Sequence, residues 1–239
     1  MLTVSSQLLA AEATRLRSLR AHDVLPTLSE PVFEEYVALT ARIFSLPISL
    51  ISVVEEDTVY YPANRGMSGH DQQPRVEALC ATAIAQAHTA IYCDLDREPS
   101  TVIPPEARQA AHDHELRFYA GALVLLPDQR PLGTLCIIDR RARAFTAEEQ
   151  QILELLAALV SQTLIVRHRC QAQPQTDGLS WERLSRELQE EIQALNALVR
   201  YLAARYGTMV PVPATFLTQV ESRIRDLQEL LDDYGLYAL

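Results

Sequence analysis

The sequence contains no lysine, since all 21 of its basic residues are arginine. This absence excludes chemistry that needs a side-chain amine, such as Schiff-base and pyridoxal-phosphate sites or a phosphate-loop lysine. The seven glycines form no GxGxxG pattern, so a dinucleotide-binding fingerprint is also missing. The formal net charge of −10 comes without a local cluster of basic residues, which argues against direct nucleic-acid binding.

Long apolar runs and paired cysteines are missing as well. No stretch of about eighteen apolar residues occurs, and the N-terminus lacks a basic segment followed by an apolar run, so we expect neither a membrane span nor a signal peptide. The sequence therefore predicts a cytoplasmic protein without membrane contact. Cys80, Cys93, Cys136 and Cys170 form no CxxC pair, which predicts free thiols and no metal site. No pattern requires a cofactor.

The residues that are present suffice for one domain of ordinary size plus an appendage, because 48% of the 239 residues are apolar. Apolar, β-branched segments predict strands at 48–54, 58–61, 89–93, 118–126 and 132–139. Helices are expected at 31–46, 76–88, 107–112 and 146–170. The last of them begins with a capping box formed by Thr146 and Glu149.

The C-terminal part has a different pattern. Residues 171–178 contain a proline and an Asp-Gly pair and are interpreted as a linker. Beyond it, apolar residues recur at spacings of three and four, which predicts a helical hairpin. Two helices bury only a narrow seam, so we predict packing against a second copy as a homodimeric four-helix bundle, with packing on its own domain as the alternative. The candidate interface residues are Leu155, Leu159, Leu188, Ile192, Leu195, Val199, Val220, Ile224, Leu227 and Leu231.

Several motifs between about Arg15 and Arg169 resemble the bacterial GAF sensor domains found before diguanylate cyclases and histidine kinases. These motifs are Leu46-Pro47-Ile48, Pro74-Arg75 before Leu79-Cys80, a strand ending at Asp94, Arg117 to Ala122, Leu132 to Asp139, and Phe145-Thr146. The resemblance implies an α+β fold, with helices on one side of an antiparallel sheet, a ligand-sized cavity on the other, and dimerisation through terminal helices. Ala78 and Leu123 replace the family's usual Ser and Pro, so no ligand is implied.

The chain is accordingly divided into four parts. Residues 1–14 are a helical extension, 15–170 the GAF-type sensor domain, 171–178 the linker, and 179–239 the hairpin, which serves dimerisation or output. A cavity for a flat small molecule is expected to use aromatic faces and a few polar tips. The candidate ligand-binding residues are Cys80, Phe118, Tyr119, Tyr60, Tyr92 and Thr134. Core packing explains the same residues equally well, and the histidines beside acidic residues at 22–23, 70–71 and 112–115 are interpreted as solvated surface.

The sequence favours a non-enzymatic signalling module that binds a small molecule or a partner protein and transmits the event through its C-terminal helices. One alternative is a ligand-free scaffold that binds a signalling protein. Another is a thiol-based methionine sulfoxide reductase, because Cys80 falls near a cysteine of those GAF proteins. Residues 97–117 contain none of the further cysteines that such an enzyme needs. Residues 171–239 contain no histidine, which excludes phosphotransfer through the usual residue.

Overall fold

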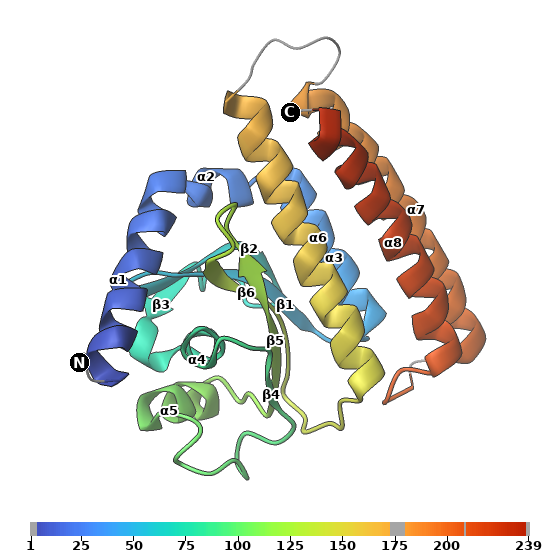
Figure 1. The fold of residues 1–239 in the computed structure, drawn as a ribbon. Coiled ribbons are helices and arrows are strands. Elements are labelled where there is room, and N and C mark those ends of the chain that lie inside the picture. Colours follow the sequence, from blue (N-terminus) through green and yellow to red (C-terminus); the bar gives the residue numbers. More distant parts are fainter. Residues whose placement is uncertain (1–3, 173–179, 208, 238–239) are drawn as a thin grey trace.

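A six-stranded antiparallel sheet in the order β3-β2-β1-β6-β5-β4 forms the centre of the computed structural model (Figure 1). The structure describes residues 4–172, 180–207 and 209–237. The strands are β1 (Ile48–Val54), β2 (Thr58–Arg65), β3 (Gln72–Pro74), β4 (Ala90–Tyr92), β5 (Phe118–Leu125) and β6 (Pro131–Asp139). The predicted α+β fold and its antiparallel sheet are thus confirmed, and β3 adds an edge strand in a segment expected to be a loop.

Helices cover both faces of the sheet (Figure 1). One face packs against α3 (Pro31–Ile43) and α6 (Ala147–Ala172), and the opposite face packs against α4 (Leu79–Gln86). The remaining helical elements are α1 (Val4–His22), α2 (Val24–Leu28), the 3-10 turn η1 (Arg75–Glu77), α5 (Pro105–Asp113), α7 (Trp181–Tyr206) and α8 (Ala214–Tyr237). Two separate apolar cores result, one on each face of the sheet.

Local sequence signals account for several helix ends. The capping box at the start of α6 is present: the Thr146 N–H donates to Glu149 Oε2 and the Glu149 N–H donates to Thr146 Oγ1. Pro31 occupies the first position of α3, where its missing N–H costs nothing. Ser180 caps α7 by accepting a hydrogen bond from the Arg183 N–H.

The C-terminal hairpin docks on its own domain. Helix α7 packs on α3 and α8 packs on α6, so that α3 and α6 cover the sheet and α7 and α8 form an outer layer on these two helices (Figure 1). The seam residues of α7 and α8 that we assigned to a second copy are all at most 3% exposed within the single chain. The expectation that the hairpin packs against a second copy is corrected, because α3 and α6 supply the apolar surface that it needs. Homodimerisation through another surface stays a prediction.

Polar contacts fix the docked hairpin at three places. The Trp181 indole donates to Glu30 Oε2 at 2.6 Å, near the start of α3. Arg42, near the end of α3, donates to Asn196 Oδ1 at 2.8 Å, in the middle of α7. The Val212 N–H, in the connection between α7 and α8, donates to Glu149 Oε1 at 3.1 Å. These contacts set the register of the apolar seam.

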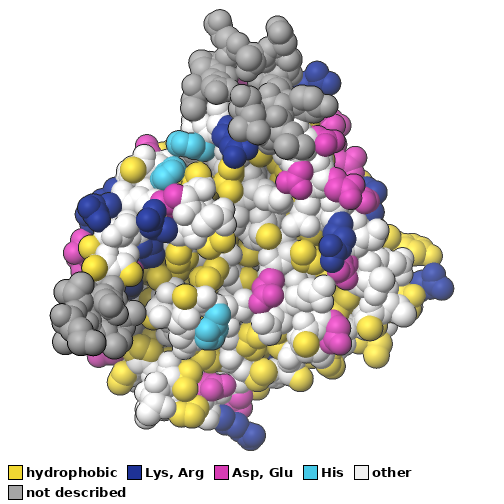
Figure 2. All heavy atoms as spheres, viewed as in Figure 1, with side chains coloured by type: hydrophobic (Ala, Val, Ile, Leu, Met, Phe, Trp, Pro, Cys, Tyr) yellow, Lys and Arg dark blue, Asp and Glu magenta, His cyan; other side chains and the backbone are white. Residues whose placement is uncertain are grey.

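The predicted division at residue 15 falls inside α1, which is continuous and docks at one end of the central strands β1 and β6. The buried guanidinium of Arg15 donates to the carbonyl oxygens of Val54 and Pro131 at 2.8 and 3.2 Å. Of the predicted linker, residues 173–178 lie outside the described residues, as do residues 1–3 of the extension. None of the described helices contains an apolar stretch that could span a bilayer, and charged side chains are dispersed among apolar ones on the face drawn in Figure 2.

Candidate functional site

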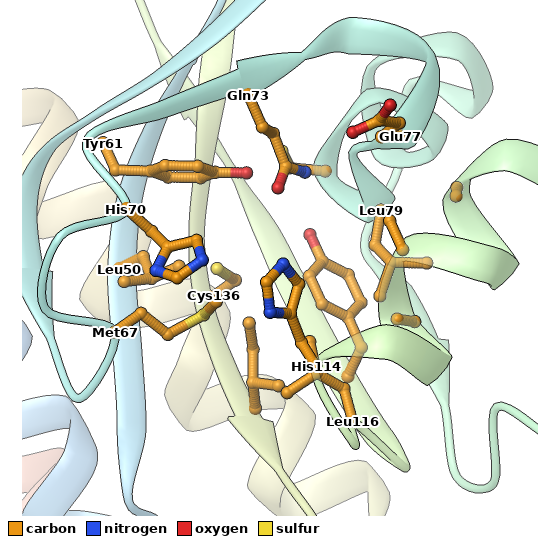
Figure 3. Close-up of a pocket in the computed structure, with 16 residues that line it drawn as sticks. Leu50, Tyr61, Met67, His70, Gln73, Glu77, Leu79, His114, Leu116 and Cys136 are labelled. Atoms are coloured by element: carbon orange, nitrogen blue, oxygen red, sulfur yellow. The ribbon is translucent and has the colours of Figure 1, made fainter.

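The candidate site is a small cavity of about 30 Å³ on the face of the sheet opposite α3 and α6 (Figure 3). The sheet supplies its floor, α4 and α5 supply one wall, and the segment from β2 to β3 closes it from the other side. The lining residues are Leu50, Tyr61, Met67, His70, Gln73, Glu77, Leu79, Cys80, Ala107, Ala110, Ala111, His114, Leu116, Tyr119, Cys136 and Ile138. This volume is room for about one water molecule.

Tyr119 of β5 and Tyr61 of β2 are the two tyrosines of the sheet that line the cavity. Tyr119 lies in a network of buried hydroxyl groups. Its hydroxyl lies 3.4 Å from Thr134 Oγ1, which in turn lies 3.0 Å from Ser52 Oγ, so three strands share one buried hydroxyl chain. Gly121 makes room for this ring, because a Cβ at that position would lie 2.2 Å from the Tyr119 hydroxyl. The orientation of Tyr119 thus depends on its hydroxyl neighbours and on glycine at position 121.

Two histidines face each other across the entrance, as Figure 3 shows. The rings of His70 and His114 come from different segments and meet edge to face, with 4.6 Å between their centroids. The Asn64 side chain holds the first segment, since its Nδ2 donates to the carbonyl oxygens of Met67 and His70 and its Oδ1 accepts from the Met67 N–H. His70 Nδ1 is buried and has no hydrogen-bond partner among the described atoms.

The interior of the cavity carries neutral polar groups. Burial raises the pKa of the Tyr61 and Tyr119 hydroxyls well above their usual value. Burial likewise raises the pKa of the Cys80 and Cys136 thiols. At neutral pH the cavity therefore presents uncharged hydroxyls, thiols and aromatic faces, while its nearest carboxylate, Glu77, lies at the rim beside Leu79 (Figure 3).

Two of the six predicted ligand-binding residues, Cys80 and Tyr119, line the cavity. Tyr92 lies directly behind it: its ring stacks on Tyr119 with 5.9 Å between centroids, and its hydroxyl donates to Thr82. Thr134 is buried beneath the floor and reaches the cavity only through the Tyr119 hydroxyl. Both residues support the site without lining it.

The predicted placement of Phe118 and Tyr60 at the cavity is corrected. Phe118 precedes Tyr119 on β5, and successive strand residues point to opposite faces, so it packs in the core against the helices. Tyr60 also packs on the face of the sheet that α3 and α6 cover, while its neighbour Tyr61 lines the cavity on the opposite face. A register shift between Ile51 and Val53, where β1 pairs with β2, disturbs the alternation there.

Sequence reasoning missed the residues of the rim. His70 and His114 were interpreted as solvated surface, because each stands beside an acidic residue in a polar segment. Both are half-buried at the cavity entrance. One sequence feature could have indicated their proximity: each histidine lies shortly before a strand, β3 for His70 and β5 for His114. The starts of these two strands lie at the same end of the sheet. No cluster of three or more metal-ligating side chains occurs among the described residues.

Comparisons with known proteins place this geometry in context. A family model described as the GAF domain matches residues 29–164, which is more than half of the chain. A cyclic di-GMP phosphodiesterase of Pseudomonas aeruginosa is 33% identical over 133 residues, which are 55% of this chain but only 22% of that relative.

Solved structures resemble this chain at lower sequence identity than that relative. The blue-light-absorbing form of the PixJ GAF domain from Thermosynechococcus elongatus aligns with a TM-score of 0.52 and 14% identity, over 64% of this chain and 94% of that one. This likeness shows a shared fold. A free methionine-R-sulfoxide reductase from Neisseria meningitidis, solved with its substrate, aligns with a TM-score of 0.48 and 17% identity, over 67% of this chain and 93% of that one.

Proposed function

Because the chain belongs to the GAF domain family of signalling and sensor modules, we propose that it is a non-enzymatic sensor whose cavity binds a small molecule and whose C-terminal hairpin responds. The observation that carries this proposal is the position of two adjacent residues on β5. Tyr119 lines the cavity, and Phe118 lies on the opposite face, in the core shared with the hairpin. Any displacement of this strand by a ligand acts on both sides of the sheet.

Ligand entry requires the rim to move. The cavity of about 30 Å³ holds no organic molecule of ordinary size, since ligand sites usually measure several hundred cubic ångströms. The obstruction consists of Met67 and the paired rings of His70 and His114, which sit on connecting segments and not on the sheet. Segments of this kind rearrange at lower cost than packed strands, so the rim is the part that opens.

A chain of contacts leads from the strand to the hairpin. The Arg143 guanidinium lies over the Phe118 ring, 5.4 Å from its centroid. Arg143 also pairs with the fully buried Glu149 at 2.5 Å, and Glu149 accepts the hydrogen bond of the Val212 N–H. A shift of Phe118 would therefore displace Arg143 and, through it, the Glu149 carboxylate that binds the connection between α7 and α8. This continuity supports transmission to the hairpin.

The proposal is tested by native mass spectrometry and fluorescence on the full chain. We expect the purified protein to retain a small molecule. When the released molecule is added back, the fluorescence emission of Trp181 should shift. Trp181 is the single tryptophan and the first residue of α7, where it contacts Glu30. Ala110→Leu at the entrance should abolish retention and shift, and Ala204→Leu, exposed on α7, should preserve both. Ligand binding without any response of the hairpin would refute the transmission step.

The ligand-free scaffold is the second candidate function, and the smallness of the cavity favours it. If the chain binds only proteins, Ala110→Leu should leave partner binding and stability unchanged, and no mass beyond the polypeptide should appear in native spectra. The two candidates thus predict opposite results for the same variant.

Thiol catalysis has less support from the site. Cys80 and Cys136 are buried in an apolar setting that disfavours the thiolate, which is the reactive form. If the chain reduced free methionine sulfoxide, Cys80→Ser would abolish turnover. We expect no turnover in the unmodified protein, measured with free methionine sulfoxide and a thiol reductant.

A further inference from the structure

The cavity adjoins an exposed acidic groove. This groove measures about 510 Å³ and is lined by Glu77, Pro105, Glu106, Gln109, Ala110, Asp113 and His114. Three of these residues, Glu77, Ala110 and His114, also line the cavity. The two hollows therefore share a wall, and a molecule bound in the cavity would reach out between His114 and the carboxylates of the groove.

No arginine balances these carboxylates among the described residues that line the cavity or the groove. The guanidinium groups nearest in sequence are engaged elsewhere. Arg75 donates to Glu12 and to the Glu55 carbonyl oxygen, and Arg108 donates to the carbonyl oxygens of Leu95 and Glu98. With no lysine in the chain, the site offers an anionic ligand only its histidines.

The entrance of the cavity holds an unpartnered polar atom. His70 Nδ1 is buried and has no partner among the described atoms, so it can accept a hydrogen bond in one tautomer and donate one in the other. Gln73 and Tyr61 point toward the same space in Figure 3. An unpaired buried nitrogen is costly unless a water molecule or a ligand satisfies it. This observation is independent of the acidic groove and points to a polar group, of a ligand or of water, beside this nitrogen.

Resting on the proposed sensor function, we propose that the cavity recognises a small ring-bearing amine, with its ring between Tyr61 and Tyr119 and its ammonium group toward Glu77 and the groove. The uncharged interior suits the ring, and the groove suits the cation. A phosphate or carboxylate in the same position would face Glu77, Glu106 and Asp113 with no lining arginine or lysine to offset them, so the site selects against cyclic dinucleotides and other anionic ligands.

The test uses three matched compounds on the full chain: 2-phenylethylamine, 2-phenylethanol and phenylacetate. Saturation-transfer NMR at low ionic strength gives the three dissociation constants. We expect the amine to bind at least about tenfold more tightly than phenylacetate, with the alcohol between them. Added salt should narrow this preference, because it screens the exposed carboxylates. Ala110→Leu should weaken binding of all three compounds if they occupy the cavity.

Charge variants assign the preference to the groove. Glu77→Gln should reduce the ratio between amine and phenylacetate by about threefold to tenfold, and Asp113→Asn, at an exposed position that tolerates exchange, should reduce it in the same direction. Glu229→Gln, exposed on α8 away from the groove, makes the same change in net charge and should leave the ratio unaltered.

Four results would overturn the ligand class. They are equal binding of amine and phenylacetate, a preference that survives both charge variants, a preference that Glu229→Gln reduces equally, and absence of binding by all three compounds. If all three compounds bind equally and Ala110→Leu blocks them, the charge selection fails while the proposed sensor cavity stands. If native spectra show no retained molecule while the amine binds selectively, the physiological sensor function fails and the chemistry of the site stands.

Discussion

Glu149 Oε1 accepts a hydrogen bond from the Val212 N–H at 3.1 Å, which joins the first turn of α6 to the connection between α7 and α8. The same carboxylate completes the capping box with Thr146 and pairs with Arg143, and its side chain is fully buried. One side chain thus closes a helix end, neutralises a buried guanidinium and fastens the hairpin to the sensor domain.

Glu149→Gln should destabilise the protein because it leaves Arg143 buried without a counter-charge. Removal of one partner from a buried ion pair costs about 3–5 kcal/mol of the free energy of unfolding. Glu148→Gln, the exposed neighbour in the same turn, should cost far less. Chemical denaturation followed by Trp181 emission measures both variants. Similar losses for the two variants would refute the role of the pair.

Ile192→Ala should loosen the hairpin from its own domain. Ile192 is fully buried in the seam of α7, and truncation of such a residue to alanine costs about 2–5 kcal/mol. Gln193→Ala, exposed at the next position, is the matched control and should change stability by no more than about 0.5 kcal/mol. Hydrogen exchange should show faster opening of α7 and α8 than of the sheet.

Light scattering on the same samples tests the predicted homodimer.

Glu12 should make stability depend on pH in the acid range. Hydrogen bonds from Arg15, with a further one from Arg75, lower its pKa from 4.5 to about 2. A carboxylate whose pKa is lower in the folded than in the unfolded state stabilises the folded protein. This contribution is complete at a pH above the unfolded-state pKa, and it disappears as the pH falls from about 4.5 to about 2.

Glu12→Gln should therefore be less stable than the parent at pH 7, and the difference should shrink over this acid range. Because the side chain is partly exposed, we expect a small effect. Urea unfolding of both proteins across pH measures it, with Glu229→Gln as the control. A stability difference between parent and Glu12→Gln that stays constant with pH would contradict the assignment.

The cysteines should differ in their reactivity toward iodoacetamide. Cys93 is exposed, whereas Cys80 and Cys136 are buried and their pKa values are raised by burial. We expect alkylation of Cys93 in the native protein, and of Cys80 and Cys136 only after unfolding. Peptide mass spectrometry at successive times measures the three rates. Rapid native labelling of Cys80 would reopen the thiol chemistry that the site disfavours.

The alternation of β5 could have excluded Phe118 from the sequence alone. Two adjacent strand residues cannot both face one cavity, so only Phe118 or Tyr119 could line it. Tyr60 and Tyr61 also point to opposite faces, but which of the two faces the cavity depends on how β2 pairs with β1, and that pairing contains a register shift. A bulge leaves little trace in the sequence, so the choice between Tyr60 and Tyr61 needed the structure.

The histidine pair shows a second limit of sequence reasoning. His70 and His114 lie 44 positions apart in polar segments, and no local pattern joins them. Their rings meet because Asn64 holds one segment over the cavity and the end of α5 brings the other to the same place. Contacts between connecting segments depend on the whole fold, and single-sequence patterns carry little information about them.

By itself, the sequence determined the elements whose causes are local: the strand segments, the capping box of α6, the apolar seams of α7 and α8, and the family motifs. Each follows from propensities and spacings within one segment. Only the tertiary structure decided which surface satisfies those seams and which residues meet at the cavity. An apolar seam specifies that it must be buried but does not specify against what, and α3 and α6 of the same chain provide that surface.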